Sequence, residues 1–166
     1  MTVMEAIRGR KSIRAYTGEP VEEEKLIQVL EAGQLAPSAR NQQAWKFYAV
    51  KNPSLREKIK EACYGQNFVG EAPVVLVACA NDVRDMRCGQ PARTVDCSIA
   101  MSFMILEATE LGLGTCWIGS FSPDEIRKIL NIPADYDIVA VSPLGYPAVE
   151  GNPRSRKPLP EIAEYK

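Results

Sequence analysis

Histidine is absent from the 166-residue sequence. Without it, Ser-His-Asp and Cys-His catalysis are excluded, and the commonest side-chain ligand of transition metals is missing. We therefore predict no metal site and no catalytic group of those kinds. Any chemistry has to come from carboxylates, lysine, tyrosine or a bound cofactor, for which the protein supplies position and electrostatics.

The sequence also lacks a C-x-x-C pair of the redox or zinc type. An odd number of cysteines favours reduced, mostly buried thiols over a disulfide framework. The five are Cys63, Cys79, Cys88, Cys97 and Cys116. Because a nucleophilic thiol needs a neighbouring base or a positive environment, a catalytic cysteine is disfavoured.

No long hydrophobic run is present. The longest mainly apolar stretch, Ile99–Leu106, is interrupted by Ser102 and bounded by charges, so no membrane segment is predicted. The N-terminus meets Glu5 and Arg8 at once and lacks the apolar core of a signal peptide, which favours a cytoplasmic protein.

Length and composition favour one globular domain over residues 1–166, with 46% hydrophobic and 25% charged residues. Net charge is -1, so a broad nucleic-acid surface is not predicted. The charge is nevertheless uneven, because basic residues gather near both ends of the chain. They are Arg8, Arg10, Lys11 and Arg14, and then Arg154, Arg156 and Lys157.

Local signals predict an α+β fold, a mixed sheet flanked by helices with one central buried helix. Capping signals and helical spacing predict helices at Thr2–Arg10, Glu22–Leu35, Asn52–Cys63, Thr94–Leu111 and Ser122–Asn131. Apolar and β-branched runs predict strands at Trp45–Val50, Pro73–Ala80, Trp117–Ile118 and Asp137–Leu144. Gly112 is expected to end the central helix, and the tail from Gly151 is too polar to form a core element.

The basic segment, defined as Arg10–Arg14, follows the first predicted helix. On an extended backbone, Arg10, Ser12 and Arg14 would point to one side and form a phosphate or ribityl clamp. A solvated helix end whose charges offset the helix dipole is the equally good alternative from spacing alone.

Two further segments could bind a ligand. The glycine segment, Gly112–Ser120, fits neither the dinucleotide nor the P-loop pattern, but Gly119 would let a flat ligand approach the backbone. The polar loop, Pro37–Gln43, offers amides and a hydroxyl for the polar edge of a heteroaromatic ring. Taken alone, Gly112 and Gly114 are better explained by helix termination and a tight turn, and the polar loop by an ordinary turn.

Taken together, these segments resemble the nitroreductase family of flavoproteins. The family's R-[RK]-S-x-R-x-[YF] pattern stands at Arg10–Tyr16, its P-S-S-x-N-x-Q-P-W loop is similar to Pro37–Trp45, and G-L-G-T-C-W-I-G is intact at Gly112–Gly119. The R-K-P-L ending is found at Arg156–Leu159. Four motifs in the family's order cover nearly the whole chain.

The resemblance implies a homodimer with two FMN molecules at the subunit interface. The flavin would carry the chemistry, so no catalytic side chain is expected. The residues it implies for the phosphate and ribityl chain are Arg10, Lys11, Ser12, Arg14, Arg154 and Arg156. Those it implies from the partner subunit are Pro37, Ser38 and Asn41, and those along the ring are Gln66, Ile118, Gly119 and Ser120, with backbone N–H groups from the last three.

The implied activity is hydride transfer from NADH or NADPH through FMN to a small-molecule electron acceptor, a nitroaromatic, quinone or similar flat compound. Arg87 or Arg93 would be the candidates to contact the 2′-phosphate of NADPH. The alternative is a non-catalytic flavin- or nucleotide-binding or sensing protein. Nucleic-acid binding through the basic ends is disfavoured by the negative net charge.

Two departures from the family pattern concern the site. Ala39 and Ala44 replace the usual serine and proline of the family motif at Pro37–Trp45, which removes a hydroxyl and some rigidity. The chain also lacks the long helical insertion of larger members. We therefore expect an active site that is open or covered by the segment Asp82–Gln90.

Overall fold

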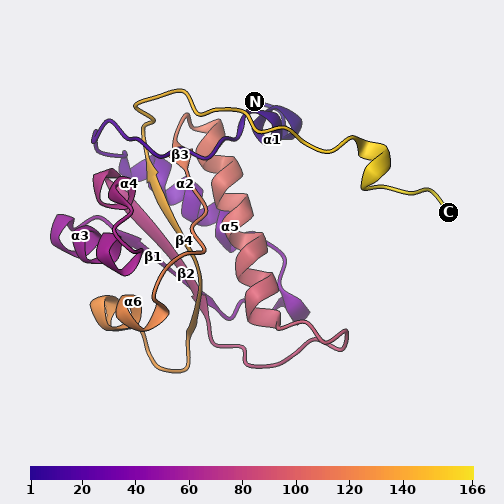
Figure 1. Ribbon diagram of the computed structural model, residues 1–166. Helices are drawn as coiled ribbons and strands as arrows, with labels where there is room; N and C mark the ends of the chain where they lie inside the picture. Colours follow the sequence, from indigo (N-terminus) through magenta and orange to yellow (C-terminus); the bar gives the residue numbers. More distant parts are fainter.

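A computed structural model describes residues 1–166 as a four-stranded sheet with helices on both faces (Figure 1). The helices are α1 (Val3–Gly9), α2 (Glu23–Gln34), α3 (Pro53–Ala62), α4 (Asn67–Glu71), α5 (Ala92–Glu110) and α6 (Pro123–Leu130). The strands are β1 (Trp45–Val50), β2 (Val74–Ala80), β3 (Gly114–Thr115) and β4 (Asp137–Gly145). Short 3-10 helices lie at Ala39–Asn41 and Leu159–Glu161.

The sheet has the order β1-β2-β4-β3, and every neighbouring pair of these strands is antiparallel. The parallel component of the expected mixed sheet is limited to one bridge between Ser12 and Thr115. The predicted α+β class is confirmed. β1 and β2, and likewise β3 and β4, are neighbours in the sheet although helices connect them, so sequence spacing does not reveal that they pair antiparallel.

Alternate residues of β2 build the core on both faces of the sheet. Leu76 belongs to the cluster that contains residues of α2 and α5, whereas Val77 belongs to the cluster that contains residues of α3, α4 and α6. All seven residues of β2 are buried. This burial on both faces explains why the sequence of β2 is an unbroken run of apolar residues.

The central helix α5 begins two residues before the predicted Thr94 and ends at Glu110. Gly112 follows with φ of 76°, a conformation that glycine adopts without strain, so its predicted role as the helix stop is confirmed. Because α5 runs across one face of the sheet, it separates two ends of the molecule (Figure 1).

One local prediction needs correction, and one short helix was not predicted. Trp117–Ile118 is not a strand: the strand is Gly114–Thr115, which pairs with Gly145 and Leu144, and Ile118 makes only an isolated bridge to Val141. Helix α4 was not predicted, because it has only five residues and no side-chain cap at Gln66.

The tail after Gly151 first passes α1 and then extends away from the sheet and helices (Figure 1). Its residues from Asn152 onward are all exposed, as the polar composition predicted. No helix of the chain combines the length and the apolar character required to cross a membrane.

Candidate functional site

The basic segment is held in an extended conformation beside the glycine segment. The Ile13 N–H donates to the Thr115 carbonyl at 2.8 Å, and the Ile13 side chain is buried with Tyr16 and Ala72. Ser12 and Arg14 stay exposed on the other side. The extended geometry assumed for the clamp is therefore present, and burial of Ile13 anchors it.

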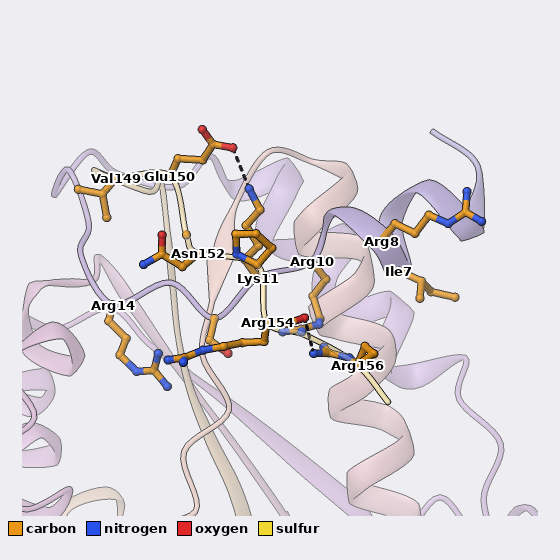
Figure 2. Close-up of a pocket in the computed structure, with 13 residues that line it drawn as sticks. Ile7, Arg8, Arg10, Lys11, Arg14, Val149, Glu150, Asn152, Arg154 and Arg156 are labelled. Atoms are coloured by element: carbon orange, nitrogen blue, oxygen red, sulfur yellow. Dashed lines mark hydrogen bonds and ion pairs between the residues drawn. The ribbon is translucent and has the colours of Figure 1, made fainter. Parts of the chain in front are cut away.

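A cavity of about 510 Å³ lies between α1, the basic segment and the start of the tail. Figure 2 shows cationic side chains gathered around it from the basic segment and the tail, whereas Arg8 on α1 lies at its edge and points away. Of the predicted phosphate residues, all six line this cavity: Arg10, Lys11, Ser12, Arg14, Arg154 and Arg156. The tertiary structure thus brings the two ends of the chain together.

The cavity carries a large excess of positive charge. Its lining has one carboxylate, Glu150, which accepts from the Lys11 ammonium at 2.8 Å, and this hydrogen bond lowers the pKa of Glu150. None of the five arginines has a carboxylate partner; they are Arg8, Arg10, Arg14, Arg154 and Arg156. Unpaired guanidinium groups around one cavity suit a phosphate group.

Sequence reasoning did not select several residues of this cavity. Arg8 stands on the last turn of α1, and its spacing of two from Arg10 could have indicated it. Val149, Asn152 and Pro153 contribute through the tail, which carries no motif at these positions.

The end of the glycine segment presents free backbone donors. Gly119 and Ser120 are exposed, their N–H groups make no hydrogen bond within the chain, and a Cβ at Gly119 would meet nothing within 4 Å. Ile118 differs, because it is buried and its N–H donates to the Val141 carbonyl at 2.8 Å. The expectation of an available Ile118 N–H is corrected accordingly.

Gln66 lies beside this segment. Its side-chain Nε2 donates to the carbonyls of Cys63 at 2.9 Å and Ser120 at 3.2 Å. The amide oxygen has no donor within the chain, so it remains free to accept a hydrogen bond from a ligand.

The four buried thiols do not have the properties of nucleophiles. Four of the five are buried and none forms a disulfide. Burial raises the pKa of Cys63 and Cys97 to about 12 and that of Cys79 to about 11. Burial also raises the pKa of Cys116, although Arg14 opposes this. These thiols stay protonated near neutral pH.

The polar loop lies at the opposite end of α5 from the cavity. The Ala39 N–H bonds to the Asp96 carboxylate on the second turn of α5, whereas Gly9, next to the basic segment, lies against Thr109 near the last turn. The rise of an α-helix places these two positions about 20 Å apart. Within one chain, Pro37, Ser38 and Asn41 are therefore not part of the arginine cavity.

The segment Asp82–Gln90 also lies near the start of α5, since the Ala92 N–H donates to the Arg84 carbonyl. It does not cover the cavity of its own chain. Of the two candidates for a 2′-phosphate, Arg93 is engaged in an ion pair with Asp137 at 2.6 Å, and Arg87 is exposed with no ion pair.

Comparisons with known proteins agree with the four motifs. The Nitroreductase family model matches residues 7–72 and 62–146. NADH dehydrogenase of Thermus thermophilus is 34% identical, over 95% of this chain and 92% of that protein. FMN reductase (NAD(P)H) of Bacillus subtilis is 32% identical, over 94% of this chain and 70% of that protein. A crystal structure of a nitroreductase family protein from Clostridium novyi has 33% identity and a TM-score of 0.84, covering 89% of this chain and 86% of that one. The chain belongs to the nitroreductase family.

Proposed function

We propose that this protein is an NAD(P)H-dependent FMN oxidoreductase whose acceptor is a nitroaromatic, a quinone or a similar flat compound. The arginine cavity is the observation that carries the proposal, because it offers a phosphate group the guanidinium groups of Arg10, Arg14, Arg154 and Arg156, which have no carboxylate partners. The family match and the relative named FMN reductase (NAD(P)H) support the cofactor and the reductant. When bound, FMN supplies hydride transfer between the reduced nicotinamide and the acceptor.

The phosphate end fits the donors that are present. Arg10, Arg14, Arg154 and Arg156 would bind the phosphate oxygens, and the Ser12 hydroxyl would donate beside them. Lys11 would act less directly, since its ammonium is already paired with Glu150.

The ring end fits the free groups at the glycine segment. The N–H groups of Gly119 and Ser120 would donate to the ring, and the Gln66 amide oxygen would accept from its polar edge. Oriented backbone donors stabilise negative charge without an acid–base side chain. This accounts for a site without histidine or a thiolate.

A homodimer would unite the two ends of α5 in one site. In such a dimer the polar loop of one subunit, with Pro37, Ser38 and Asn41, would meet FMN held by the arginine cavity of the other. Exposed apolar side chains support an interface: Val3, Met4 and Ile7 on α1 are 73%, 53% and 48% exposed, and Phe103 on α5 is 40% exposed. The extended tail, with exposed Leu159 and Ile162, would reach the partner subunit.

We further propose that residues 1–166 act as one FMN-binding domain, because both core clusters share the same sheet. A cytoplasmic location is supported by five cysteines that form no disulfide.

The first test is the absorption spectrum of the purified protein, with and without added FMN. We expect a yellow protein whose flavin absorbance is bleached anaerobically by NADH or NADPH and returns with a quinone or nitroaromatic. A colourless protein that takes up no FMN would contradict the proposal. Bound FMN that neither reductant bleaches would instead favour a non-catalytic flavin-binding protein.

A further inference from the structure

Asp96 is a buried carboxylate with a single bonded neighbour. Its residue is 4% exposed, and both oxygens accept the Ala39 N–H, at 3.0 and 3.1 Å. No other donor of the chain bonds to it. Because a buried carboxylate is unfavourable without hydrogen bonds, the conformation of Asp96 and that of the polar loop depend on each other.

The polar loop needs such an anchor, because its backbone is strained. Arg40, Asn41 and Gln43 have φ of 56°, 54° and 50°, in the left-handed region that favours glycine. Within the loop, the Ser38 hydroxyl accepts the Gln43 N–H at 3.1 Å, and the Ser38 carbonyl accepts the Asn41 N–H at 2.9 Å. These bonds close the loop on itself. The bond to Asp96 is the one that ties it to α5.

We propose that Asp96 is a positioning residue for the cofactor site. By holding Ala39, it keeps Ser38–Gln43 in the strained shape in which Ser38 and Asn41 meet FMN bound by the partner subunit. The inference rests on the proposed function, since the loop otherwise has no ligand to meet. In this arrangement the exposed side chain of Asn41 would bind FMN. The Ser38 hydroxyl would chiefly hold the shape of the loop, through the hydrogen bond that it accepts from the Gln43 N–H.

The test compares Asp96→Asn with the wild type in two measurements. The first is the rate of tryptic cleavage after Arg40 in the apoprotein, located by mass spectrometry, because Arg40 is exposed. The second is the dissociation constant of FMN. We expect both to rise about tenfold, since asparagine replaces a charge-assisted hydrogen bond with a neutral one.

Asp124→Asn is the matched control. Asp124 is exposed on α6, outside the polar loop and the arginine cavity, and makes no side-chain hydrogen bond, so its substitution changes the charge equally without touching the loop. Cleavage and FMN affinity should stay at the wild-type values.

Two more variants separate a loop effect from a general loss of structure. Gln43→Gly added to Asp96→Asn should recover part of the FMN affinity, because glycine adopts the positive φ without strain. If Asp96→Asn does not fold, Ala39→Pro combined with Asp96→Leu removes the N–H and the buried carboxylate together, so that neither is left unpaired. Ser38 has ψ of 157°, which is compatible with a following proline.

The outcomes distinguish this inference from the function on which it rests. A wild type that takes up no FMN removes the proposed function and the positioning role with it. A wild type that binds FMN, with an Asp96 variant whose loop opens while its FMN affinity is unchanged, removes the positioning role alone. Unchanged cleavage after Arg40 in the variant also overturns it.

Discussion

Arg14 is a charged residue that the fold does not need. It is exposed, lines the arginine cavity and has no ion pair. The neighbouring Ile13, in contrast, is buried and anchors the basic segment. Adjacent residues of one extended segment therefore divide between the proposed ligand binding and folding, which allows single substitutions to separate the two.

Arg14→Ala should raise the FMN dissociation constant about tenfold to a hundredfold, because a charge-assisted hydrogen bond contributes about 1.5–3 kcal/mol. The free energy of unfolding should change by less than about 0.5 kcal/mol, as for other exposed positions. FMN titration and chemical denaturation measure these quantities.

Lys58→Ala is the control, because Lys58 is an exposed cation outside the cavity and has no ion pair. Equal FMN affinity in Arg14→Ala and the wild type would show that the clamp is misassigned.

Gly114 and Gly119 should respond in opposite ways to alanine. A Cβ at Gly114 would lie 2.7 Å from the Ile13 side chain, so Gly114→Ala should lower the free energy of unfolding by about 1–3 kcal/mol. A Cβ at Gly119 meets open space, so Gly119→Ala should leave the melting temperature unchanged and weaken FMN binding. Thermal denaturation and FMN titration distinguish them. If Gly119→Ala binds FMN as the wild type does, the ring does not approach this backbone.

At the scale of elements, α5 organises both parts of the proposed site. Its last turn lies against the end of α1 and its second turn holds the polar loop, so its length sets the distance between them. The segment before α5 is held by a separate ion pair. The Arg84 guanidinium donates to both Asp82 oxygens, at 2.8 and 2.7 Å.

The Asp82 pair should produce an acid-dependent change in this segment. The hydrogen bonds from Arg84 lower the pKa of Asp82 to about 2. A depressed folded-state pKa gives stability that is present above the unfolded value, about 3.9, and is lost as pH falls through the folded value. NMR titration of the Asp82 carboxyl carbon should therefore give a midpoint near 2. Arg84→Gln should move the midpoint up, and a wild-type midpoint near 4 would disprove the pairing in solution.

At the scale of the whole molecule, the proposed dimer makes each site a composite of two chains. Arg14→Ala removes a group from the arginine cavity, and Asn41→Ala removes a group from the polar loop. After subunits of the two variants are mixed and exchanged, each mixed dimer has one intact site and one doubly damaged site. About a quarter of the sites should then bind FMN with wild-type affinity. FMN titration of the mixture measures this fraction, and no recovery despite verified exchange would argue that each site belongs to one chain.

Much of the fold could be predicted because its signals are local. The Thr2 and Ser122 caps and the apolar run of β2 each act on neighbouring residues, so those elements were placed within a few residues. The predictions failed where an element depends on residues that are distant in the sequence. Gly114–Thr115 became the strand rather than Trp117–Ile118 because its partners, Leu144 and Gly145, lie 30 residues further along the chain.

The family follows from four ordered motifs in the sequence, and the chemical types available to the proposed site follow from the absence of histidine and the basic residues at both ends. Which of these residues meet depends on the folded chain. It brought Arg154 and Arg156 to the basic segment, paired Lys11 with Glu150 and withdrew the Ile118 N–H into the sheet. It also placed the polar loop at the far end of α5. The physical reason is that charge and hydrogen-bonding capacity belong to single residues, whereas distance depends on how the whole chain packs.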